Sequence, residues 1–340
     1  MGTLHPGHGR AAGPETAAAR TRLVRMIALG GGLTDPRWRA AFDEVPRDVF
    51  VPSFYEPMAG GYELVAADDP DPRRRGRWLR GVYRDGPLAT RIGEDGALVS
   101  SSSQPSLMAL MLDALDVEDG CRVLEIGTGS GYNAALLSHR LGDRAVTTID
   151  LEEEITSVAR ERLAAAGYRP AVVTGDGALG CPRRAPFDRI IATCSLGSVP
   201  VAWPRQCAAG AKILAPMATG LIALRVARDG GRAEGRFLAT PVFFVPLRTT
   251  DASAGGDAAG PGVTGRGVPR HALADDRFRF LLSLAAGSLP PREAYELWRR
   301  ERRPTRERYG VTVEGDRQWA WLDSPDGPYV WQTGGAPNGA

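Results

Sequence analysis

Lysine, cysteine, histidine and long apolar runs are all scarce in this 340-residue sequence. No apolar stretch approaches the ~20 residues needed to cross a bilayer. The first 19 residues lack the charged-then-apolar order of a signal peptide. A net charge of +2 is too small for a field that would gather nucleic acid. We therefore expect a cytoplasmic protein that binds neither a membrane nor a nucleic acid.

Metal-ligand and disulfide patterns are missing as well. The four cysteines form no CxxC pair, and the four histidines are scattered along the chain. We therefore expect neither a disulfide framework nor a metal site. Lys212 is the one lysine among the 42 lysine and arginine residues, which together with abundant Ala, Gly and Pro is typical of GC-rich coding. The number of arginines therefore says little about function.

The composition is that of a globular protein, with 43% hydrophobic and 24% charged residues. The central part alternates short apolar runs with helical patterns, which is typical of βαβ units and predicts an α/β fold with a parallel sheet. Strands are expected at residues 122–126, 145–149, 171–174, 188–193, 212–216, 221–227, 235–240 and 242–247. Helices are expected at residues 22–29, 132–140, 152–166, 201–208, 277–286 and 291–300, with one more after Asp35-Pro36.

Shifts in composition divide the chain into five segments. They are a disordered N-terminus (1–20), a helical N-terminal segment (21–98), an α/β core (99–250), a linker (251–269) and a C-terminal extension (270–340). The second segment contains an insertion, 66–98. In its first part, residues 66–80, acidic residues precede basic ones, which predicts a solvated loop. The stretch 45–52, punctuated by prolines, is expected to be extended.

The strongest local signal is a glycine-rich turn between an apolar strand and a helix, Gly127-Thr128-Gly129-Ser130-Gly131. Glycines allow a sharp turn and let a ligand approach the backbone N–H groups without a Cβ in the way. Asp150 ends the next strand, where a carboxylate accepts hydrogen bonds from both hydroxyls of a ribose. Asp176 follows the third strand. Three successive strand ends thus predict a nucleotide-binding crevice, with a tight turn and a helix cap as the structural alternative.

Several motifs, in their order along the chain, resemble protein-L-isoaspartate O-methyltransferases. They span about residues 21–248 and are Arg47-Asp48-Val49-Phe50-Val51-Pro52, Ser103-Gln104-Pro105, the stretch 123–131, Gly175-Asp176-Gly177, Pro186-Phe187-Asp188 and Phe244-Val245-Pro246-Leu247. The resemblance implies a Rossmann-like sheet with helices on both faces and an S-adenosylmethionine-dependent carboxyl O-methyltransferase whose product is S-adenosylhomocysteine. It also implies a peptide or protein substrate bearing Asp or isoaspartate, and we expect a monomer.

The same resemblance assigns site residues. Gly127, Gly129 and Gly131 would lie against the cofactor, Asp150 at its ribose and Asp176 near its adenine. Further cofactor contacts are expected from Glu125, Thr128, Tyr132, Leu151, Gly175 and Gly177. Ser103 would orient the reacting carboxylate, with Ser101 and Ser102 as neighbouring candidates, and no metal is expected. The sequence alone leaves a cap of the helix after Gln104 as an equal alternative for Ser103.

Because the group that accepts the methyl group is a carboxylate, catalysis requires alignment more than proton transfer. Its reference pKa is near ~4, so at pH 7 it is already a nucleophile and needs no general base. The enzyme must hold it in line with the methyl group, and such alignment accounts for ~7 to 11 kcal/mol of a barrier in favourable cases.

This sequence differs in three features from the compact repair enzymes of this family. A serine run from Ser100 to Ser103 replaces the usual Thr-Ile-Ser, and both the insertion 66–98 and the segment after Arg248 are additions. The additions resemble those of actinobacterial methyltransferases of lanthipeptides and graspetides, which convert an aspartate into a methyl ester that closes to a succinimide (aspartimide). Tailoring of a ribosomal peptide is therefore the first hypothesis. General repair of isoaspartyl proteins is the alternative, and a non-catalytic or NAD-binding Rossmann module is disfavoured by the GxGxG spacing.

The C-terminal extension concentrates Trp and Arg, which are residue types that dominate recognition hot spots. We therefore expect residues 270–340 to select a structured peptide without being needed for the core fold. A packed cap that shields the sheet is the alternative.

Overall fold

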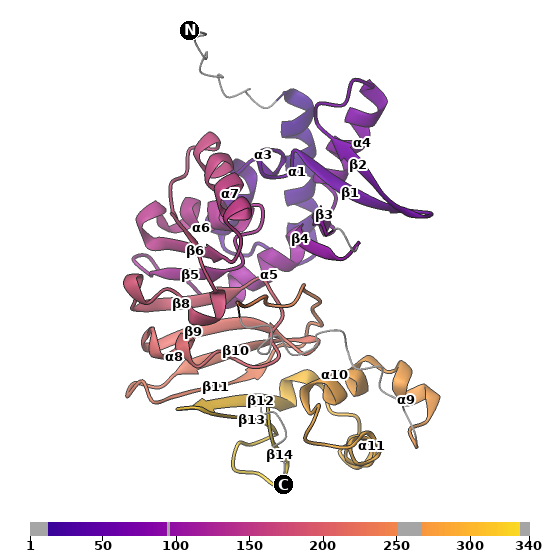
Figure 1. Cartoon of the computed structure of the whole chain (residues 1–340), viewed down its shortest axis with the longest axis vertical. Coiled ribbons are helices and arrows are strands. Elements are labelled where there is room, and N and C mark those ends of the chain that lie inside the picture. Colours follow the sequence, from indigo (N-terminus) through magenta and orange to yellow (C-terminus); the bar gives the residue numbers. More distant parts are fainter. Residues whose placement is uncertain (1–12, 94–95, 251–266, 334–340) are drawn as a thin grey trace. The chain divides into compact units, whose positions relative to one another are not determined.

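The computed structural model describes residues 13–93, 96–250 and 267–333. The chain divides into two compact units, each assembled from separate stretches of sequence (Figure 1). The first comprises Met1–Asp113, Gly129–Arg144 and Glu154–Val172, and the second comprises Ala114–Thr128, Ala145–Glu153 and Val173–Ala340. The glycine-rich turn is thus shared between them, with Gly127 and Thr128 in the second unit and the rest in the first.

The first unit contains a four-stranded antiparallel sheet with the order β2-β1-β3-β4. Its strands are β1 (Ser53–Met58), β2 (Gly61–Ala66), β3 (Leu88–Ile92) and β4 (Leu98–Ser102). The helices that lie wholly or mostly in this unit are α1 (Pro14–Leu29), α2 (Pro36–Glu44), α3 (Arg47–Phe50), α4 (Pro72–Val82), α5 (Pro105–Leu115), α6 (Tyr132–Leu141) and α7 (Glu153–Ala165).

Helix α1 begins earlier than the sequence predicts. The expected disorder of residues 1–20 is wrong for residues 14–20, which are helical, while residues 1–12 lie outside the described residues. Pro14 at the first position and Glu15 in the first turn suit a helix N-terminus. The alanines that follow have the highest helix propensity, so this stretch continues without a break into the predicted helix.

Residues 66–80 are not the solvated loop that their charges predict. They include most of helix α4, and Asp71 caps this helix by accepting the N–H of Arg73 at 2.8 Å. The rest of the insertion 66–98 contains strand β3. Arg74 donates to Asp69 and to Glu63, each at 2.6 Å. Charges that are segregated in the sequence therefore pair in the fold. The stretch 45–52 likewise departs from its predicted extended form, because it contains the helical turn α3.

Within the described residues, the second unit is built on a ten-stranded sheet with the order β14-β13-β12-β11-β10-β9-β8-β5-β6-β7. Its strands are β5 (Val123–Ile126), β6 (Val146–Asp150), β7 (Ala171–Thr174), β8 (Phe187–Ala192), β9 (Cys207–Met217), β10 (Gly220–Val226), β11 (Arg232–Phe237), β12 (Tyr309–Glu314), β13 (Arg317–Leu322) and β14 (Val330–Gln332). Its helices are α8 (Ala202–Arg205), α9 (Arg270–Ala274), α10 (Asp276–Leu284) and α11 (Pro291–Arg300).

This sheet has a parallel and an antiparallel part. β5 pairs in parallel with β6 and with β8, and β8 with β9, whereas β9 to β14 are successive antiparallel neighbours. The arrangement confirms the predicted α/β, Rossmann-like class. The chain reverses its direction of travel across the sheet between β5 and β8. In such sheets ligands bind beyond the carboxyl ends of the strands at this switch point.

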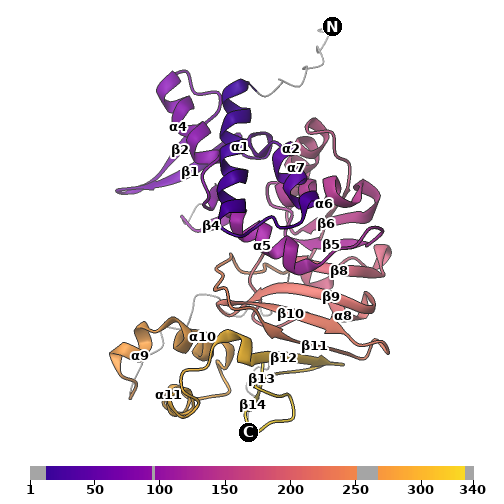
Figure 2. The ribbon, with the colours of Figure 1, turned by 180° about the vertical axis from the view of Figure 1, so that it is seen from behind.

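The C-terminal extension continues the sheet of the second unit. Strand β12 pairs with β11, and the two lie side by side in both views (Figures 1 and 2). One hydrophobic core runs from Leu124 of β5 to Trp331 of β14 and includes Phe280 and Trp298 of the extension. The extension therefore shares sheet and core with the parallel strands, which favours the packed cap over a segment that is dispensable for folding.

The other predicted elements of the core occur close to their expected positions. The main exception is 242–247, which forms no strand in the described structure and contributes a single bridge between Pro246 and Ser195. Most of the predicted linker 251–269 lies outside the described residues. Among the described helices, none combines the length and apolar character that a membrane span needs.

Candidate functional site

The turn after β5 is held closely against the end of β8. Gly127 has a φ of +95°, in the left-handed region that favours glycine. Its carbonyl accepts a hydrogen bond of 2.8 Å from the hydroxyl of Thr193. A Cβ at position 127 would lie 2.7 Å from that hydroxyl oxygen, so a larger residue would displace Thr193 and would have a strained φ.

A chain of buried hydrogen bonds fixes the start of this turn. Thr148 on β6 donates its hydroxyl proton to the fully buried carboxylate of Glu125 at 2.7 Å. Because that proton is committed, Thr128 is the donor in the 2.8 Å contact between the Thr128 and Thr148 hydroxyls. The side chains of Glu125 and Thr128, both predicted at the cofactor, therefore face this internal network and position the turn.

Asp150 ends β6 with its carboxylate 10% exposed. One carboxylate oxygen accepts the N–H of Leu151 at 2.9 Å. Arg248 places a guanidinium nitrogen 3.7 Å from the same oxygen and also bonds to Glu152. Two carboxylates and one guanidinium thus meet at the predicted ribose position.

Asp176 uses both of its carboxylate oxygens within the chain. One accepts the N–H of Ala178 at 2.8 Å and so caps the short 3-10 helix Gly177–Leu179. The other accepts the N–H and the hydroxyl of Thr250, at 2.9 and 3.0 Å. An adenine amino group at Asp176 would have to share that oxygen with Thr250.

The glycines on either side of Asp176 lie close to apolar side chains. A Cβ at Gly175 would contact Ile149 at 3.5 Å, and one at Gly177 would lie 2.7 Å from Ile126. Arg248 and Thr250 are absent from the predicted site residues. They lie one and three residues after the 244–247 motif, and that proximity is the sequence signal that points to them.

In the first unit, Gly129 lies beside strand β4 and Gly131 lies beside helix α7. Gly129 and Gly131 have φ values of +50° and +86°. A Cβ at Gly129 would lie 3.5 Å from the carbonyl oxygen of Ser101 and 3.7 Å from the hydroxyl oxygen of Ser100. A Cβ at Gly131 would lie 3.4 Å from the side chain of Ala159 on α7. The fold thus brings the serine run and the glycine turn together.

The serine run alternates in burial, as expected of a strand. Ser100 and Ser102 are buried, whereas Ser101 and Ser103 are half-buried. The hydroxyl of Ser100 accepts a hydrogen bond of 3.2 Å from Thr90 on the neighbouring strand β3. Ser101 and Ser103 are therefore the more accessible of the predicted hydroxyls.

Ser103 does not cap helix α5. The N–H of Ser106, in the first turn of α5, donates to the carboxylate of Asp85 at 2.8 Å. The side chain of Gln104 donates to the same carboxylate at 3.1 Å. Asp85, from the insertion, therefore takes the capping role, and the interpretation of Ser103 as the cap is wrong.

Arg47 ties the serine run to the rest of the first unit. Its side chain is completely buried, and burial lowers its pKa to about 10. It donates to the hydroxyl of Ser102 at 3.3 Å and to the carbonyl of Ser103 at 3.1 Å. Its other acceptors are backbone carbonyls, those of Val82, Arg84 and Gly86. The motif residue Arg47 therefore acts as a positioning residue for Ser102 and Ser103.

Tyr132 packs in the interior of the first unit. Its ring lies 5.7 Å from that of Phe50 and 6.3 Å from that of Phe42, measured between centroids. The guanidinium of Arg47 lies 5.9 Å from the same ring centroid. The side chain of Tyr132, predicted at the cofactor, therefore serves the hydrophobic packing of α6.

A pocket of about 390 Å³ lies beside Gly129 in the first unit, and we call it the Gly129 pocket. It is bordered by strands β1, β3 and β4, the glycine turn and helix α7. Its lining residues are Tyr55, Thr90, Arg91, Ile92, Ser100, Gly129, Ser130, Glu154, Ile155, Val158 and Arg162.

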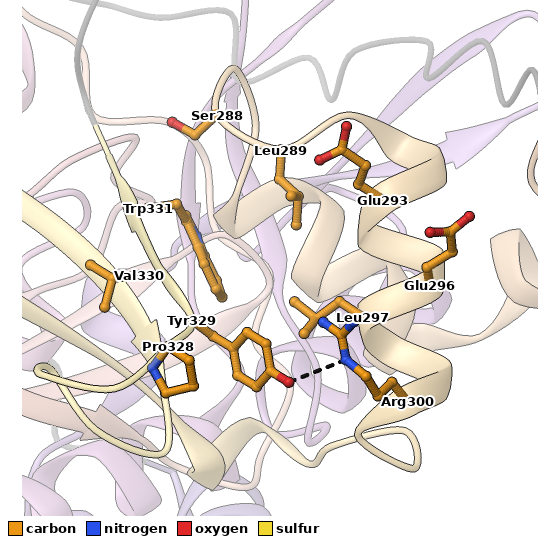
Figure 3. A pocket seen from close by; sticks show the side chains of 10 residues that line it. All are labelled: Ser288, Leu289, Glu293, Glu296, Leu297, Arg300, Pro328, Tyr329, Val330 and Trp331. Atoms are coloured by element: carbon orange, nitrogen blue, oxygen red, sulfur yellow. Dashed lines mark hydrogen bonds between the residues drawn. The ribbon is translucent and has the colours of Figure 1, made fainter.

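A second pocket, of about 320 Å³, lies in the C-terminal extension (Figure 3). Glu293, Glu296 and Arg300 of α11 line one side, and Tyr329 and Trp331 line the other. Arg300 donates to the hydroxyl of Tyr329 at 3.2 Å. This pocket is built from the extension alone and contains none of the predicted site residues.

The comparisons with known proteins all point to the same family. The profile of the protein-L-isoaspartate(D-aspartate) O-methyltransferase family matches residues 75–252. A protein-L-isoaspartate O-methyltransferase of Methylorubrum extorquens (strain PA1) is 35% identical over 237 residues, which are 69% of this chain and 90% of the relative. The protein-L-isoaspartate O-methyltransferase 2 of Anaeromyxobacter sp. (strain Fw109-5) is 34% identical over 250 residues, 72% of this chain and 88% of the relative.

Solved structures share the fold. A protein-L-isoaspartate O-methyltransferase aligns with a TM-score of 0.56 at 22% identity, covering 94% of this chain and 88% of its own. A putative protein-L-isoaspartate O-methyltransferase of Plasmodium falciparum, in complex with S-adenosyl-L-homocysteine, aligns with a TM-score of 0.51 at 15% identity, covering 68% of this chain and 99% of its own. The first alignment spans most of the extension as well as the core.

Proposed function

Because this chain belongs to the protein-L-isoaspartate(D-aspartate) O-methyltransferase family, we propose that it methylates the side-chain carboxylate of an aspartate in a modified ribosomal peptide. The class of reaction follows from the family: the chain is an S-adenosylmethionine-dependent carboxyl O-methyltransferase. The peptide acceptor and the residues that serve each step are the proposed part.

The cofactor supplies a methyl group on a positively charged sulfur. Gly127, Gly129 and Gly131 would let it approach the backbone, because all three have positive φ and no Cβ stands in the way. Asp150 would accept the ribose hydroxyls, and Asp176 would meet the adenine. Both carboxylates lie in the second unit, where Gly127 also begins the turn. As hydrogen-bond acceptors they suit the hydroxyl and amino groups of a nucleoside.

The observation that supports the acceptor assignment is the contact between the serines of β4 and Gly129. A carboxylate bound by these serines would lie next to the turn that binds the methyl donor. Ser103, which does not cap α5, would donate to one carboxylate oxygen, with Ser101 and Ser102 as its neighbours. The other oxygen attacks the methyl carbon, so that a C–O bond forms as the S–CH₃ bond breaks and a neutral thioether leaves.

In a peptide, the resulting ester would close on itself. The backbone nitrogen of the next residue attacks the ester carbonyl, methanol leaves, and a succinimide forms. The serine run is the feature that supports a specialised peptide acceptor. The segment 66–98 does not distinguish tailoring from repair, because the family profile begins at residue 75 and includes most of it. The C-terminal extension alone does not distinguish tailoring from repair, because a solved structure carrying the general family name aligns over 94% of this chain.

Repair of L-isoaspartyl residues in damaged proteins is the second candidate. The relatives named for that substrate are about one-third identical and are covered over 88% to 90% of their length. Methyl transfer to either acceptor would use the same carboxylate chemistry, so the two candidates differ in what the acceptor groove admits.

A direct comparison of two acceptors tests the proposal. Purified protein is incubated with S-adenosylmethionine and either an isoaspartyl test peptide or a cyclised ribosomal peptide that contains aspartate. Tailoring predicts a gain of one methyl group and then loss of methanol on the ribosomal peptide, seen by mass spectrometry. Turnover of the isoaspartyl peptide alone would favour repair, and no turnover of either would contradict carboxyl methylation.

Two substitutions test the residue roles. Gly129→Val adds bulk beside Ser101 and a strained φ, so it should abolish binding of S-adenosylhomocysteine in calorimetry. Ser103→Ala should lower turnover and leave that affinity unchanged, because the lost hydrogen bond belongs to alignment of the acceptor. Ser106→Ala is the matched control, since Ser106 contacts Gln104 and not the glycine turn. Wild-type turnover in Ser103→Ala would move the role to Ser101 or Ser102.

A further inference from the structure

The Gly129 pocket has a surplus of positive charge. Among its described lining residues are two guanidinium groups, Arg91 and Arg162, and one carboxylate, Glu154. Arg91 and Glu154 pair with each other at 2.8 Å. Arg162 forms no ion pair with any described residue and donates to the backbone carbonyl of Phe50 at 3.1 Å. Of the two guanidinium groups that line the pocket, Arg162 is therefore the one without a carboxylate partner among the lining residues.

Helix α7 fixes where this charge lies. Ile155, Val158 and Arg162 are three and four residues apart, so they share one face of the helix, and all three line the pocket. Arginine has five N–H donors in a planar fork. The bond to Phe50 uses one of them, which leaves donors available to a ligand.

The surroundings of Arg162 favour an anionic ligand. Burial lowers the pKa of Arg162, with the nearby Glu161 opposing the shift. A guanidinium nevertheless stays charged in proteins at pH 7. A charge that is partly removed from water and unpaired gains from a charge-assisted hydrogen bond, which is about twice as strong as a neutral one.

We propose that Arg162 binds a carboxylate in the Gly129 pocket. The inference rests on the proposed methyl transfer, whose reactants supply two such groups. One is the carboxylate of the amino-acid part of S-adenosylmethionine, and the other is a carboxylate of the aspartyl peptide. The planar fork of arginine matches either of them in a bidentate way. The hydroxyl of Ser100, which lines the same pocket and accepts the proton of Thr90, still has its own proton to donate to the same group.

Calorimetry with two nucleosides separates the sources. S-adenosylhomocysteine carries the carboxylate, and 5′-methylthioadenosine lacks it. If the cofactor supplies the group, Arg162→Gln weakens binding of S-adenosylhomocysteine by about tenfold or more, the usual range for a hydrogen bond to a charged group. Binding of 5′-methylthioadenosine stays at the wild-type value, which also shows that the site is still folded. Arg162→Lys, which keeps the charge without the fork, recovers part of the loss.

If the peptide supplies the group, both nucleosides bind Arg162→Gln as they bind the wild type. The KM for the acceptor peptide then rises by about tenfold, and kcat changes less. Arg160→Gln is the matched control, because Arg160 lies on the same helix, is exposed, and also donates to one backbone carbonyl, that of Val172. It should change neither quantity.

Equal nucleoside affinities and equal peptide KM in the wild type and Arg162→Gln would overturn the inference. Equal losses for both nucleosides would also overturn it, because they would indicate a structural role for Arg162. Failure of the wild type itself to bind S-adenosylhomocysteine would instead contradict the proposed cofactor residues. The two failures are therefore distinguishable.

Discussion

The sheet of the first unit and the C-terminal extension of the second both lie outside the parallel strands, and they are stabilised by different interactions. In the first, charged side chains connect the elements. Arg77 of α4 bonds to Glu56 of β1 at 2.9 Å and to Glu63 of β2 at 2.7 Å. The Arg77 side chain is 41% exposed, and exposed ion pairs contribute little to stability.

The extension is stabilised by buried aromatic rings. Phe278, Phe280, Trp298 and Tyr309 are each at most 1% exposed. The ring of Phe280 lies 4.9 Å from that of Phe237 on β11, and so joins the extension to the core sheet. Burying a side chain of this size contributes about 1.5 to 3 kcal/mol. The comparison shows that an added segment can be integral to a core even when its sequence follows a linker-like stretch.

Removal of the extension is expected to have the largest effect. A chain that ends at Thr250 would expose the edge of β11 and the apolar faces that now contact α10 and β12. Unpaired strand edges and exposed apolar patches promote aggregation. We therefore expect this truncated chain to aggregate, as measured by size-exclusion chromatography. A monodisperse truncated protein that binds S-adenosylhomocysteine would show instead that the extension serves recognition alone.

A single substitution gives a milder form of the same test. Trp298→Ala should lower the free energy of unfolding in urea by about 3 to 5 kcal/mol, because it leaves a cavity in the shared core. Trp298→Phe should cost less, since the indole N–H has no hydrogen-bond partner within the described structure. Trp319→Ala, at a half-buried position of the same extension, is the control and should cost less than Trp298→Ala. Similar losses at both positions would mean that the extension is not anchored by its buried rings.

The α/β core is the part of the fold that the sequence predicts best. Short apolar runs separated by helical patterns locate β5 to β8. The signal is clearest for β5 and β8, because their burial on both faces leaves a continuous apolar run. The turn at Gly127 is equally visible, since its backbone conformation requires glycine. Strands β12 to β14 are not predicted, because their aromatic residues indicate burial without indicating which edge they pair with.

The candidate site is predicted in part. The serines and glycines are identified by the family resemblance, and their contact at Gly129 depends on the fold. Arg47 and Asp85 have no local signal for their roles, because their acceptors and donors lie far away in the sequence. Arg162 appears in the sequence as one more charge on a helix. The lining of the pocket shows that the one carboxylate there, Glu154, pairs with Arg91 and not with Arg162.

Arg47 provides an intermediate test, within the first unit. Arg47→Met removes the donor of five hydrogen bonds and leaves buried carbonyls without a partner. We expect a loss of about 2 to 3 kcal/mol in the free energy of unfolding. Turnover should fall further than stability alone explains, because Ser102 and Ser103 lose their common anchor. Arg84→Met, at an exposed side chain, is the control, and equal turnover in both variants would contradict the positioning role.

The smallest effect is expected at Arg77, where exposed charges connect the sheet to α4. Hydrogen bonds from Arg77 and Arg74 lower the pKa of Glu63 below its usual 4.5. A carboxylate with a lowered pKa stabilises the folded state above its unfolded pKa, and the contribution disappears as the pH falls through the folded value. Arg77→Gln should therefore lower the melting temperature slightly at pH 7, and the difference from wild type should shrink below about pH 4.5. Arg73→Gln, whose exposed side chain lies on the same helix, should show neither effect. A difference that persists unchanged at pH 3, or a loss at pH 7 as large as that of Arg47→Met, would show that more than charge pairing holds this sheet to α4.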